Sequence, residues 1–157
     1  MSSLRVGLGV DAHAFEDGVP LVLGGLSFDH PRGLAGHSDG DVVVHALIDA
    51  LLGAAGLGDI GTLFPADATL PEGVDSTELL RGSCERIRGA GFEIVNAACV
   101  LIGQEPRLGD RRPELEARLT AVVGAPVSLG ATTTDRLGFT GRGEGLACQA
   151  IALLERP

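Results

Sequence analysis

The sequence predicts an α/β or α+β fold in which helices pack on one face of a single mixed β-sheet, within one domain spanning residues 1–157. Apolar runs typical of strands alternate along the chain with segments whose apolar residues recur at helical spacing. The length of 157 residues is enough for one domain with its own core. Hydrophobic residues make up 45% of the chain and aromatic residues only 3%, so we expect a mainly aliphatic core.

Five apolar segments are predicted to form strands. The first is followed by the polar residues Asp11-Ala12-His13, which are expected to form a turn. The second is interrupted by Gly24-Gly25, because glycine accommodates the positive φ angles of sharp turns. The five predicted strands cover residues 4–10, 21–28, 92–102, 127–132 and 145–154.

Three segments are predicted to be helical, at about residues 41–55, 76–88 and 113–123. In the first, Val44, Leu47, Ile48, Leu51 and Leu52 recur at helical spacing, and Ser38 or Asp39 is expected to cap its N-terminus. Between the first two helices, residues 56–75 are expected to be irregular. A loop of this length in a small domain is usually functional.

Charge and cysteine content exclude several classes of function. The formal net charge of -9 argues against nucleic acid or an anionic membrane as a partner, since both attract lysine and arginine. The three cysteines form no CxxC pair, which indicates reduced thiols rather than a disulfide framework. The first residues resemble no signal peptide, and no apolar run is long enough to span a bilayer. We therefore expect a cytoplasmic protein.

The pattern Asp11-x-His13, together with His45, predicts a metal site. Residues two apart in an extended segment point the same way, and a helix is expected to supply His45 as a third ligand. Two imidazoles and one carboxylate leave a fourth position open, as in catalytic zinc sites. The short motif is weak alone, because it is also compatible with a turn aspartate and a half-buried histidine. Asp41 and Asp49 lie one turn on either side of His45, either to hold its ring or to form a solvated acidic face.

Three further segments are candidates for binding phosphate or hydroxyl groups. Residues 36–41 lead into a helix N-terminus, where free N–H groups and His37 suit a phosphate, although an ordinary helix cap has the same pattern. Residues 131–135 offer three threonine hydroxyls and Asp135, a ligand for a hard divalent cation, unless they form only a surface loop. Asp59 is either a ligand for substrate hydroxyls or a simple turn residue.

Together these motifs resemble the 2-C-methyl-D-erythritol 2,4-cyclodiphosphate synthase family along nearly the whole chain. The strongest stretches are GVDAH at 9–13, GHSDGDVVVHALIDALLGAAGLGDIG at 36–61 and ATTTDRLGFTGRGEG at 131–145. The resemblance implies a phosphorus–oxygen lyase of isoprenoid-precursor synthesis. It would convert 4-diphosphocytidyl-2-C-methyl-D-erythritol 2-phosphate to the cyclic diphosphate and CMP, by attack of the 2-phosphate on the β-phosphate. It also implies a homotrimer with active sites between subunits and an axial cavity for an isoprenoid diphosphate.

The resemblance also assigns roles to residues. Asp11, His13 and His45 would bind one zinc ion per subunit, and Asp135 a magnesium or manganese ion. His37 and Thr133 would stabilise the transition state. Ser38 would hold the attacking phosphate, residues 103–109 would form the cytidine-binding loop, and Arg142 and Phe139 would bind the nucleotide or line the trimer axis. The implied substrate contacts are Ser38, Asp59, Ile60, Gly61, Phe64, Asp67, Gly103, Pro106, Arg107, Leu108, Gly109, Ala131, Thr132, Thr134, Phe139 and Arg142.

The chain departs from the family pattern at Asp135, where glutamate is usual, at Ala66, where an acidic residue or proline is usual, and at Ala98, where aspartate is often found. Two other functions compete with the cyclase. One is a metal-dependent phosphohydrolase in which His37 activates water. The other is a non-enzymatic trimer that binds isoprenoid diphosphates, although such a binder has no need of an open zinc site beside a second cation site.

Overall fold

The computed structural model describes residues 1–65 and 70–157. Its main sheet has five strands in the order β4-β1-β7-β5-β6, in which only β5 and β6 run parallel, so the sheet is mixed as predicted. A short hairpin of two further strands forms a separate sheet, so the prediction of a single sheet is wrong in this respect. The strands are β1 (Ser3–Asp17), β2 (Leu21–Leu23), β3 (Leu26–Phe28), β4 (Arg32–Leu34), β5 (Glu93–Ile102), β6 (Val127–Thr132) and β7 (Gly145–Arg156).

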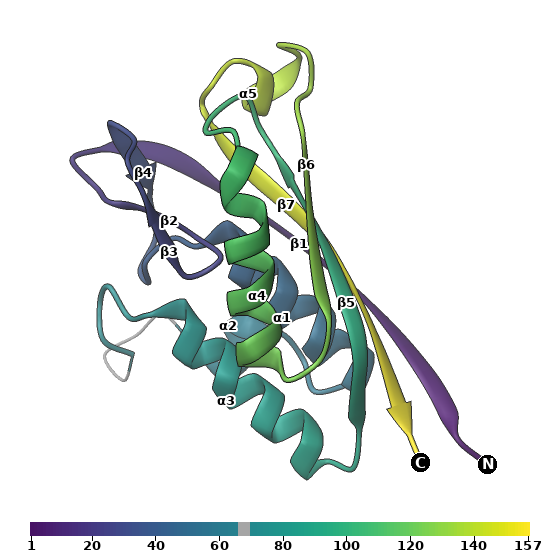
Figure 1. The fold of residues 1–157 in the computed structure, drawn as a ribbon. Helices are drawn as coiled ribbons and strands as arrows, with labels where there is room; N and C mark the ends of the chain where they lie inside the picture. The colour runs from purple at the N-terminus through teal and green to yellow at the C-terminus, as the bar shows by residue number, and fades with distance from the viewer. Residues whose placement is uncertain (66–69) are drawn as a thin grey trace.

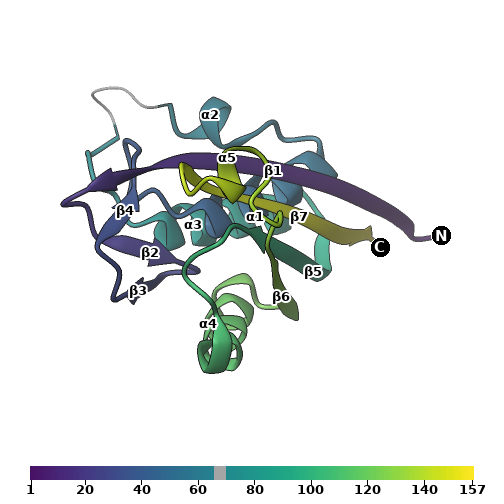
Figure 2. The ribbon, with the colours of Figure 1, turned by 90° about the horizontal axis from the view of Figure 1, so that it is seen from above.

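Three long helices lie on one face of the main sheet, as the sequence predicts (Figures 1 and 2). They are α1 (Val42–Ala55), α3 (Ser76–Gly89) and α4 (Arg112–Val123). Two four-residue helices, α2 (Ile60–Leu63) and α5 (Gly138–Gly141), lie in connections, and a 3-10 turn (Gly109–Arg111) precedes α4. In the part of the chain that the structure describes, no helix is long and apolar enough to cross a membrane.

Helix α1 packs unusually close to β1 because two glycines of the strand face it. A Cβ atom at Gly9 would lie 2.0 Å from the carbonyl oxygen of Ala46, and one at Gly7 would lie 2.0 Å from that of Ala50. Any side chain at these positions would therefore push the helix away from the sheet. Alternation along the strand places Asp11 and His13 on the same face as the two glycines. The close packing thus brings the start of α1, with His45, next to them.

The opposite face of the sheet is apolar and exposed. Alternate residues of β1 point to this face, while the intervening ones point to the helices. Strands β5 and β7 continue the exposed aliphatic surface. Its members are Leu4, Val6, Leu8, Val10, Val95, Val100 and Ile151, each at least 40% exposed. A contiguous apolar surface of this kind is typical of an interface with another molecule.

Several local predictions need correction. The residues Asp11-Ala12-His13 are not a turn, because β1 continues to Asp17 and pairs with β7 as far as Ala14 opposite Gly145. The N-cap of α1 is Asp41 rather than Ser38 or Asp39, since its carboxylate accepts a hydrogen bond from the N–H of Val44. The region 56–75 is not wholly irregular, because it contains α2. Strand β4 was not predicted, because three residues leave no periodic signal.

The three cysteines, all within the described residues, are buried and free of disulfides, which agrees with the sequence prediction of reduced thiols. Cys99 and Cys148 face the helices from β5 and β7 in the aliphatic core. Burial raises the pKa of the Cys84 thiol to about 11. Since the thiolate is the reactive form, Cys84 is a packing residue rather than a nucleophile.

Candidate metal and nucleotide site

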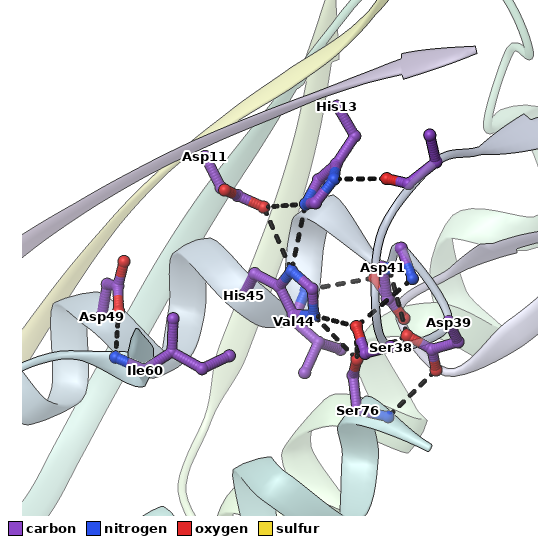
Figure 3. A network of polar contacts seen from close by, with 12 residues as sticks. Asp11, His13, Ser38, Asp39, Asp41, Val44, His45, Asp49, Ile60 and Ser76 are labelled. Atoms are coloured by element: carbon purple, nitrogen blue, oxygen red, sulfur yellow. Dashed lines mark hydrogen bonds and ion pairs between the residues drawn. The ribbon is translucent and has the colours of Figure 1, made fainter. Parts of the chain in front are cut away.

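Asp11, His13 and His45 converge on one point, which we call the metal site (Figure 3). Asp11 Oδ2 lies 2.7 Å from His13 Nε2 and 3.2 Å from His45 Nδ1. The two imidazole nitrogens are 3.1 Å apart. Strand β1 supplies the first two residues, and α1 supplies the third, as predicted for His45. In the described part of the chain, no other group of three histidine, cysteine or acidic side chains converges in this way.

The second nitrogen of each imidazole also has hydrogen-bond partners in the protein. His13 Nδ1 donates to the carbonyl oxygen of Ala35, 2.7 Å away, at the end of β4. His45 Nε2 faces two hydroxyl oxygens, Ser38 Oγ at 2.9 Å and Ser76 Oγ at 2.8 Å. Both rings are thus oriented with their other nitrogen toward Asp11. Ligating histidines are commonly held by such outer hydrogen bonds, so these residues fit a metal ion.

Asp41 and Asp49 do not hold the His45 ring, and Asp41, which is fully buried, does not form a solvated acidic face either, so both alternatives are wrong for Asp41. Asp41 is fully buried at the N-terminus of α1, where it accepts from the N–H groups of Val44, Gly24 and Gly25. Burial, with repulsion from a nearby carboxylate, raises the pKa of Asp41 to about 6. Asp49 instead accepts from the N–H of Ile60 at 2.8 Å. The first aspartate therefore anchors the β2–β3 hairpin on α1, and the second anchors α2.

The charges at the metal site favour a cation. Burial tends to raise the pKa of Asp11, but hydrogen bonds from His13 and His45 outweigh it and lower the pKa to about 2. The hydrogen bond to Asp11 in turn raises the pKa of His13. The carboxylate is therefore ionised at neutral pH and is available as an anionic ligand.

The loop before α1 holds His37 and Ser38 beside the metal site. His37 Nε2 donates to the carbonyl oxygen of Leu70 at 2.8 Å, and the N–H of Gly73 donates to the His37 carbonyl at 2.7 Å. His37 is therefore attached to the segment that leads into α3. Ser76, the first residue of that helix, was not predicted as a site residue. Its distance of 31 positions from His45 leaves no local signal in the sequence.

A second group of predicted residues lines a cavity of about 370 Å³, which we call the β6 cavity. The end of β6 and the connection between β5 and α4 form its walls. These two segments meet because β5 and β6 are parallel neighbours that end together, with Ile102 opposite Thr132. Arg112 also lines the cavity and was not singled out from the sequence. The lining residues are Gly103, Gln104, Pro106, Arg107, Leu108, Gly109, Arg112, Ala131, Thr132 and Thr133.

The loop after β6 carries exposed residues. Asp135 has a positive φ of 51° and is contacted by the Thr133 hydroxyl at 3.3 Å. The Thr134 hydroxyl is used within the loop, where it lies 2.9 Å from Thr140 Oγ1 and also donates to a backbone carbonyl. Phe139 is 44% exposed and Arg142 pairs with a neighbouring glutamate. Apart from Thr134, these side chains are available to a ligand.

Helix α2 presents the predicted residues Asp59, Ile60 and Gly61 near the surface. Asp59 caps the helix by accepting from the N–H and hydroxyl of Thr62, at 2.8 and 2.7 Å. These hydrogen bonds lower the pKa of Asp59. Phe64 follows the helix and is half-buried. Asp67, another predicted contact, and Ala66, a departure from the family pattern, lie outside the described residues.

A larger cavity of about 590 Å³, the arginine cavity, lies beside these loops. Its basic side chains come from three segments that are distant in sequence, so no single sequence motif predicts it. Within it, the Arg32 guanidinium lies 4.4 Å from the Phe15 ring centre, and His30 Nε2 lies 3.3 Å from a Glu105 carboxylate oxygen. The lining residues are Phe15, His30, Arg32, Gln104, Glu105, Pro106, Arg107, Arg136, Gly141, Arg142 and Gly143.

The metal site and the β6 cavity are separated across the sheet of one chain. His13 pairs with Leu146 on β7, the next residue Ala147 pairs with Ile102 on β5, and Ile102 pairs with Thr132 on β6. The two sites therefore lie at the same level of the sheet, three strands apart. At the usual spacing between strands, this separation is about 14 Å.

Comparison with known proteins agrees with this geometry. A bifunctional enzyme IspD/IspF of Clavibacter michiganensis is 54% identical over 99% of this chain, which spans 38% of that longer protein. The 2-C-methyl-D-erythritol 2,4-cyclodiphosphate synthase of Alkalilimnicola ehrlichii is 51% identical, over 98% of this chain and 96% of the relative. A solved synthase structure in a CDP-bound form superposes with a TM-score of 0.86 at 38% identity, over 96% of this chain and 99% of that one.

The match extends over almost every residue discussed above. The family model of the YgbB family covers residues 4–155, which include both ligating segments of the metal site and all of the β6 cavity. The relatives of similar length are covered nearly from end to end, so the similarity is not confined to a shared motif. The chain belongs to the YgbB family.

Proposed function

We propose that this chain is a 2-C-methyl-D-erythritol 2,4-cyclodiphosphate synthase, as its relatives are named. Its substrate would be 4-diphosphocytidyl-2-C-methyl-D-erythritol 2-phosphate. An oxygen of the 2-phosphate forms a bond to the β-phosphorus, the bond from that phosphorus to the bridging oxygen of CMP breaks, and CMP leaves with that oxygen. The observation that carries the proposal is the convergence of Asp11, His13 and His45 in a chain that matches this family throughout.

The metal site is proposed to hold one zinc ion per subunit, with Asp11, His13 and His45 as ligands. Two imidazoles and a carboxylate are typical zinc ligands and leave a position for a phosphate oxygen. A zinc ion bound there would act as a Lewis acid that withdraws negative charge from the β-phosphate. Asp135 is proposed to hold a magnesium or manganese ion at the diphosphate. Its exposed carboxylate suits these ions, which take few protein ligands when phosphate oxygens complete the shell.

The residues around the metal site would position the methylerythritol phosphate. The attacking oxygen already carries negative charge, so the site needs alignment and charge neutralisation more than a strong base. Ser38 is proposed to donate a hydrogen bond to the 2-phosphate, and His37 and Thr133 are proposed to stabilise the charge that develops in the transition state. On α2, Asp59, with the backbone of Ile60 and Gly61, would orient the substrate hydroxyls, beside Phe64.

The β6 cavity is proposed to bind the cytidine moiety. A related synthase structure is described as a CDP-bound form, and its chain superposes on 96% of this one. Residues 103, 104 and 106–109 line the cavity together with Thr132 and Thr133, whose hydroxyls are proposed to lie near the diphosphate. Arg107 and Arg112 add positive charge at the same place.

We further propose that the enzyme is a homotrimer whose active sites are shared between subunits. Two features support this assembly. In one chain the metal site on β1 and the β6 cavity have strands β7 and β5 between them, and the outer face of the sheet is apolar and exposed. Packing of this face around a threefold axis would bury it, leaving Phe139 and Arg142 near an axial cavity for an isoprenoid diphosphate. The expected location is the cytoplasm, where the buried thiols stay reduced.

The reaction is tested by incubating purified protein with the cytidyl diphosphate substrate, zinc and magnesium, and following the products by phosphorus NMR. Equal amounts of CMP and a cyclic diphosphate would establish the cyclase. CMP with an open-chain product would mean that water is the nucleophile, as in a phosphohydrolase. Binding of isoprenoid diphosphates without turnover would favour a non-enzymatic binding protein. Native mass spectrometry of the same sample tests the trimer.

A further inference from the structure

His45 differs from His13 in how its outer nitrogen is held. His13 donates to a backbone carbonyl, whereas His45 Nε2 faces the hydroxyl oxygens of Ser38 and Ser76 (Figure 3). A hydroxyl is able to donate or accept, so by itself it does not decide which imidazole nitrogen carries the proton. A further group must fix the direction of this hydrogen bond.

Asp39 fixes that direction through Ser76. The Ser76 hydroxyl donates to Asp39 Oδ1, and the Ser76 N–H donates to Asp39 Oδ2 at 3.0 Å. The hydroxyl proton of Ser76 is therefore committed to the carboxylate, which leaves the oxygen as an acceptor for His45 Nε2–H. In the structure Nδ1 lies 3.2 Å from Asp11 Oδ2 and hydrogen-bonds to it. When a metal ion takes the place of that hydrogen bond, the proton on Nε2 would stay, and the lone pair of Nδ1 would face the ion.

Ser76 is better placed for this role than Ser38. The Ser76 residue is completely buried at the first position of α3, so its hydroxyl is shielded from water and from substrate. Ser38 is only half-buried, and its hydroxyl is proposed to donate to the attacking phosphate. When substrate is bound, Ser76 remains as the hydroxyl that holds the His45 ring.

The segment that carries Ser76 is tied to the loop that carries Asp39. The N–H of Asp39 donates to the carbonyl oxygen of Val74 at 3.1 Å, and the N–H of Gly73 donates to that of His37 at 2.7 Å. Asp75 caps α3 by accepting from the N–H of Thr77. The start of the helix is thus fixed from both sides, with the Ser76 hydroxyl directed at the imidazole.

We propose that Ser76 and Asp39 are positioning residues of the metal site, which act through His45 without touching metal or substrate. Helix α3 is then a third element of the metal site, beside β1 and α1. The inference rests on the proposed metal function of Asp11, His13 and His45. Loss of such an outer hydrogen bond commonly weakens metal binding about 10- to 100-fold.

The test compares Ser76→Ala with Ser83→Ala. Ser83 is a matched control, because it is also fully buried in α3, but its hydroxyl donates to the Leu79 carbonyl within the helix. The zinc affinity of each protein is measured by competition with a chromogenic chelator, and the absorption spectrum of the cobalt-substituted protein reports the ligand geometry. We expect Ser76→Ala to bind zinc about 10- to 100-fold more weakly and to alter the cobalt spectrum, with Ser83→Ala like wild type.

Two further variants test whether the Ser76 hydroxyl and its charged acceptor are responsible for the effect. Ser76→Thr retains the hydroxyl and is expected to restore most of the affinity, whereas Asp39→Asn removes the charged acceptor and is expected to lower it. If Ser76→Ala does not fold, the zinc affinity and cobalt spectrum of Asp39→Asn are compared with those of Ser83→Ala instead. Unchanged zinc affinity and cobalt spectrum in Ser76→Ala and Asp39→Asn would overturn the inference and leave the proposed function intact. Failure of wild type to bind zinc would instead overturn the proposed metal function.

Discussion

The metal site and the β6 cavity differ in how completely a single chain builds them. At the metal site, the ligand atoms of Asp11, His13 and His45 already converge, and the second nitrogen of each imidazole is hydrogen-bonded to the protein. At the β6 cavity, Thr132 and Thr133 are exposed, and so is Asp135 in the loop that follows β6. A buried site is fixed by packing, whereas an exposed one is completed by a ligand or a neighbouring subunit. The chain alone thus brings the three metal-site side chains together, whereas it leaves the residues at the β6 cavity exposed to a ligand or to the neighbouring subunit that we propose.

Replacing His45 with alanine is expected to have the largest effect. The variant loses one of three ligands, so zinc should fall well below one ion per subunit and turnover should be abolished. Metal analysis and the phosphorus NMR assay measure the two effects. His30→Ala, which alters a histidine outside the metal site, should keep its zinc. Full zinc occupancy with normal turnover in His45→Ala would show that the three residues are not the zinc ligands.

The N-caps of α1 and α2 allow the effect of burial on stability to be measured, because Asp41 is buried and Asp59 is exposed. Asp41→Ala removes a buried acceptor of three N–H groups, including those of Gly24 and Gly25, and is expected to cost about 2–4 kcal/mol of unfolding free energy. Asp59→Ala removes an exposed cap of α2 and should cost about 1 kcal/mol or less. Urea denaturation of the two variants measures both. Equal losses would mean that burial of the cap does not matter.

The same aspartate predicts a pH dependence. The pKa of Asp41 is about 6 in the folded chain, against 3.8 for an ordinary aspartate, so between these pH values the folded state binds a proton that the unfolded state does not. Stability from this group therefore rises as pH falls through 6, by about 2 kcal/mol from pH 7 to pH 4.5. The difference in unfolding free energy between wild type and Asp41→Ala should grow accordingly. A constant difference would contradict the raised pKa.

In the β6 cavity, Arg112→Ala is expected to weaken CDP binding about tenfold, because one charge-assisted hydrogen bond is lost. The zinc content should not change, since Arg112 is remote from the metal site in the same chain. Isothermal titration with CDP and metal analysis measure the two quantities. Loss of zinc without loss of CDP affinity would reverse the assignment of the two sites.

Asp135→Glu is expected to have the smallest effect. Glutamate restores the usual family residue, and the exposed position has room for one more methylene group. Activity should stay within about threefold of wild type, with equal or higher affinity for magnesium or manganese. Activity measured over a magnesium titration checks this. A collapse of activity would place the second metal ion elsewhere.

The sequence predicted those features that depend on local periodicity. The helices at α1, α3 and α4 and the strands β5, β6 and β7 were found to within a few residues, because each carries a regular apolar pattern. The continuation of β1 through Asp11 and His13 was missed. Polar residues favour a turn in isolation, and only the pairing with β7 keeps them extended. The three residues of β4 were missed for the same reason, since their structure depends on β1.

The site was predictable where one motif supplies several residues and not where distant segments meet. The metal ligands come from the short motif Asp11-x-His13 and from one residue of a clearly periodic helix, whereas Ser76, Arg112 and the arginine cavity follow only from the tertiary fold. The prediction that Asp41 or Asp49 holds the His45 ring failed for a related reason. Their helical spacing to His45 is right, but backbone N–H groups outside the helix compete for their carboxylates. Spacing predicts which side chains are near, but it does not predict the partner each one takes.

The central claim, that neighbouring subunits complete the site, is tested most directly by mixing two impaired variants. His45→Ala lacks the metal site and Thr133→Ala is altered at the β6 cavity, so each alone should have little activity. Hybrid trimers from an equal mixture, formed by co-expression, would contain interfaces with both halves intact. An intact site needs its metal site from a Thr133→Ala subunit and its β6 cavity from a His45→Ala subunit. Random assembly meets both conditions at about one site in four, so we expect about a quarter of wild-type activity. Activity no higher than that of the separate variants would mean that each chain builds its own complete site.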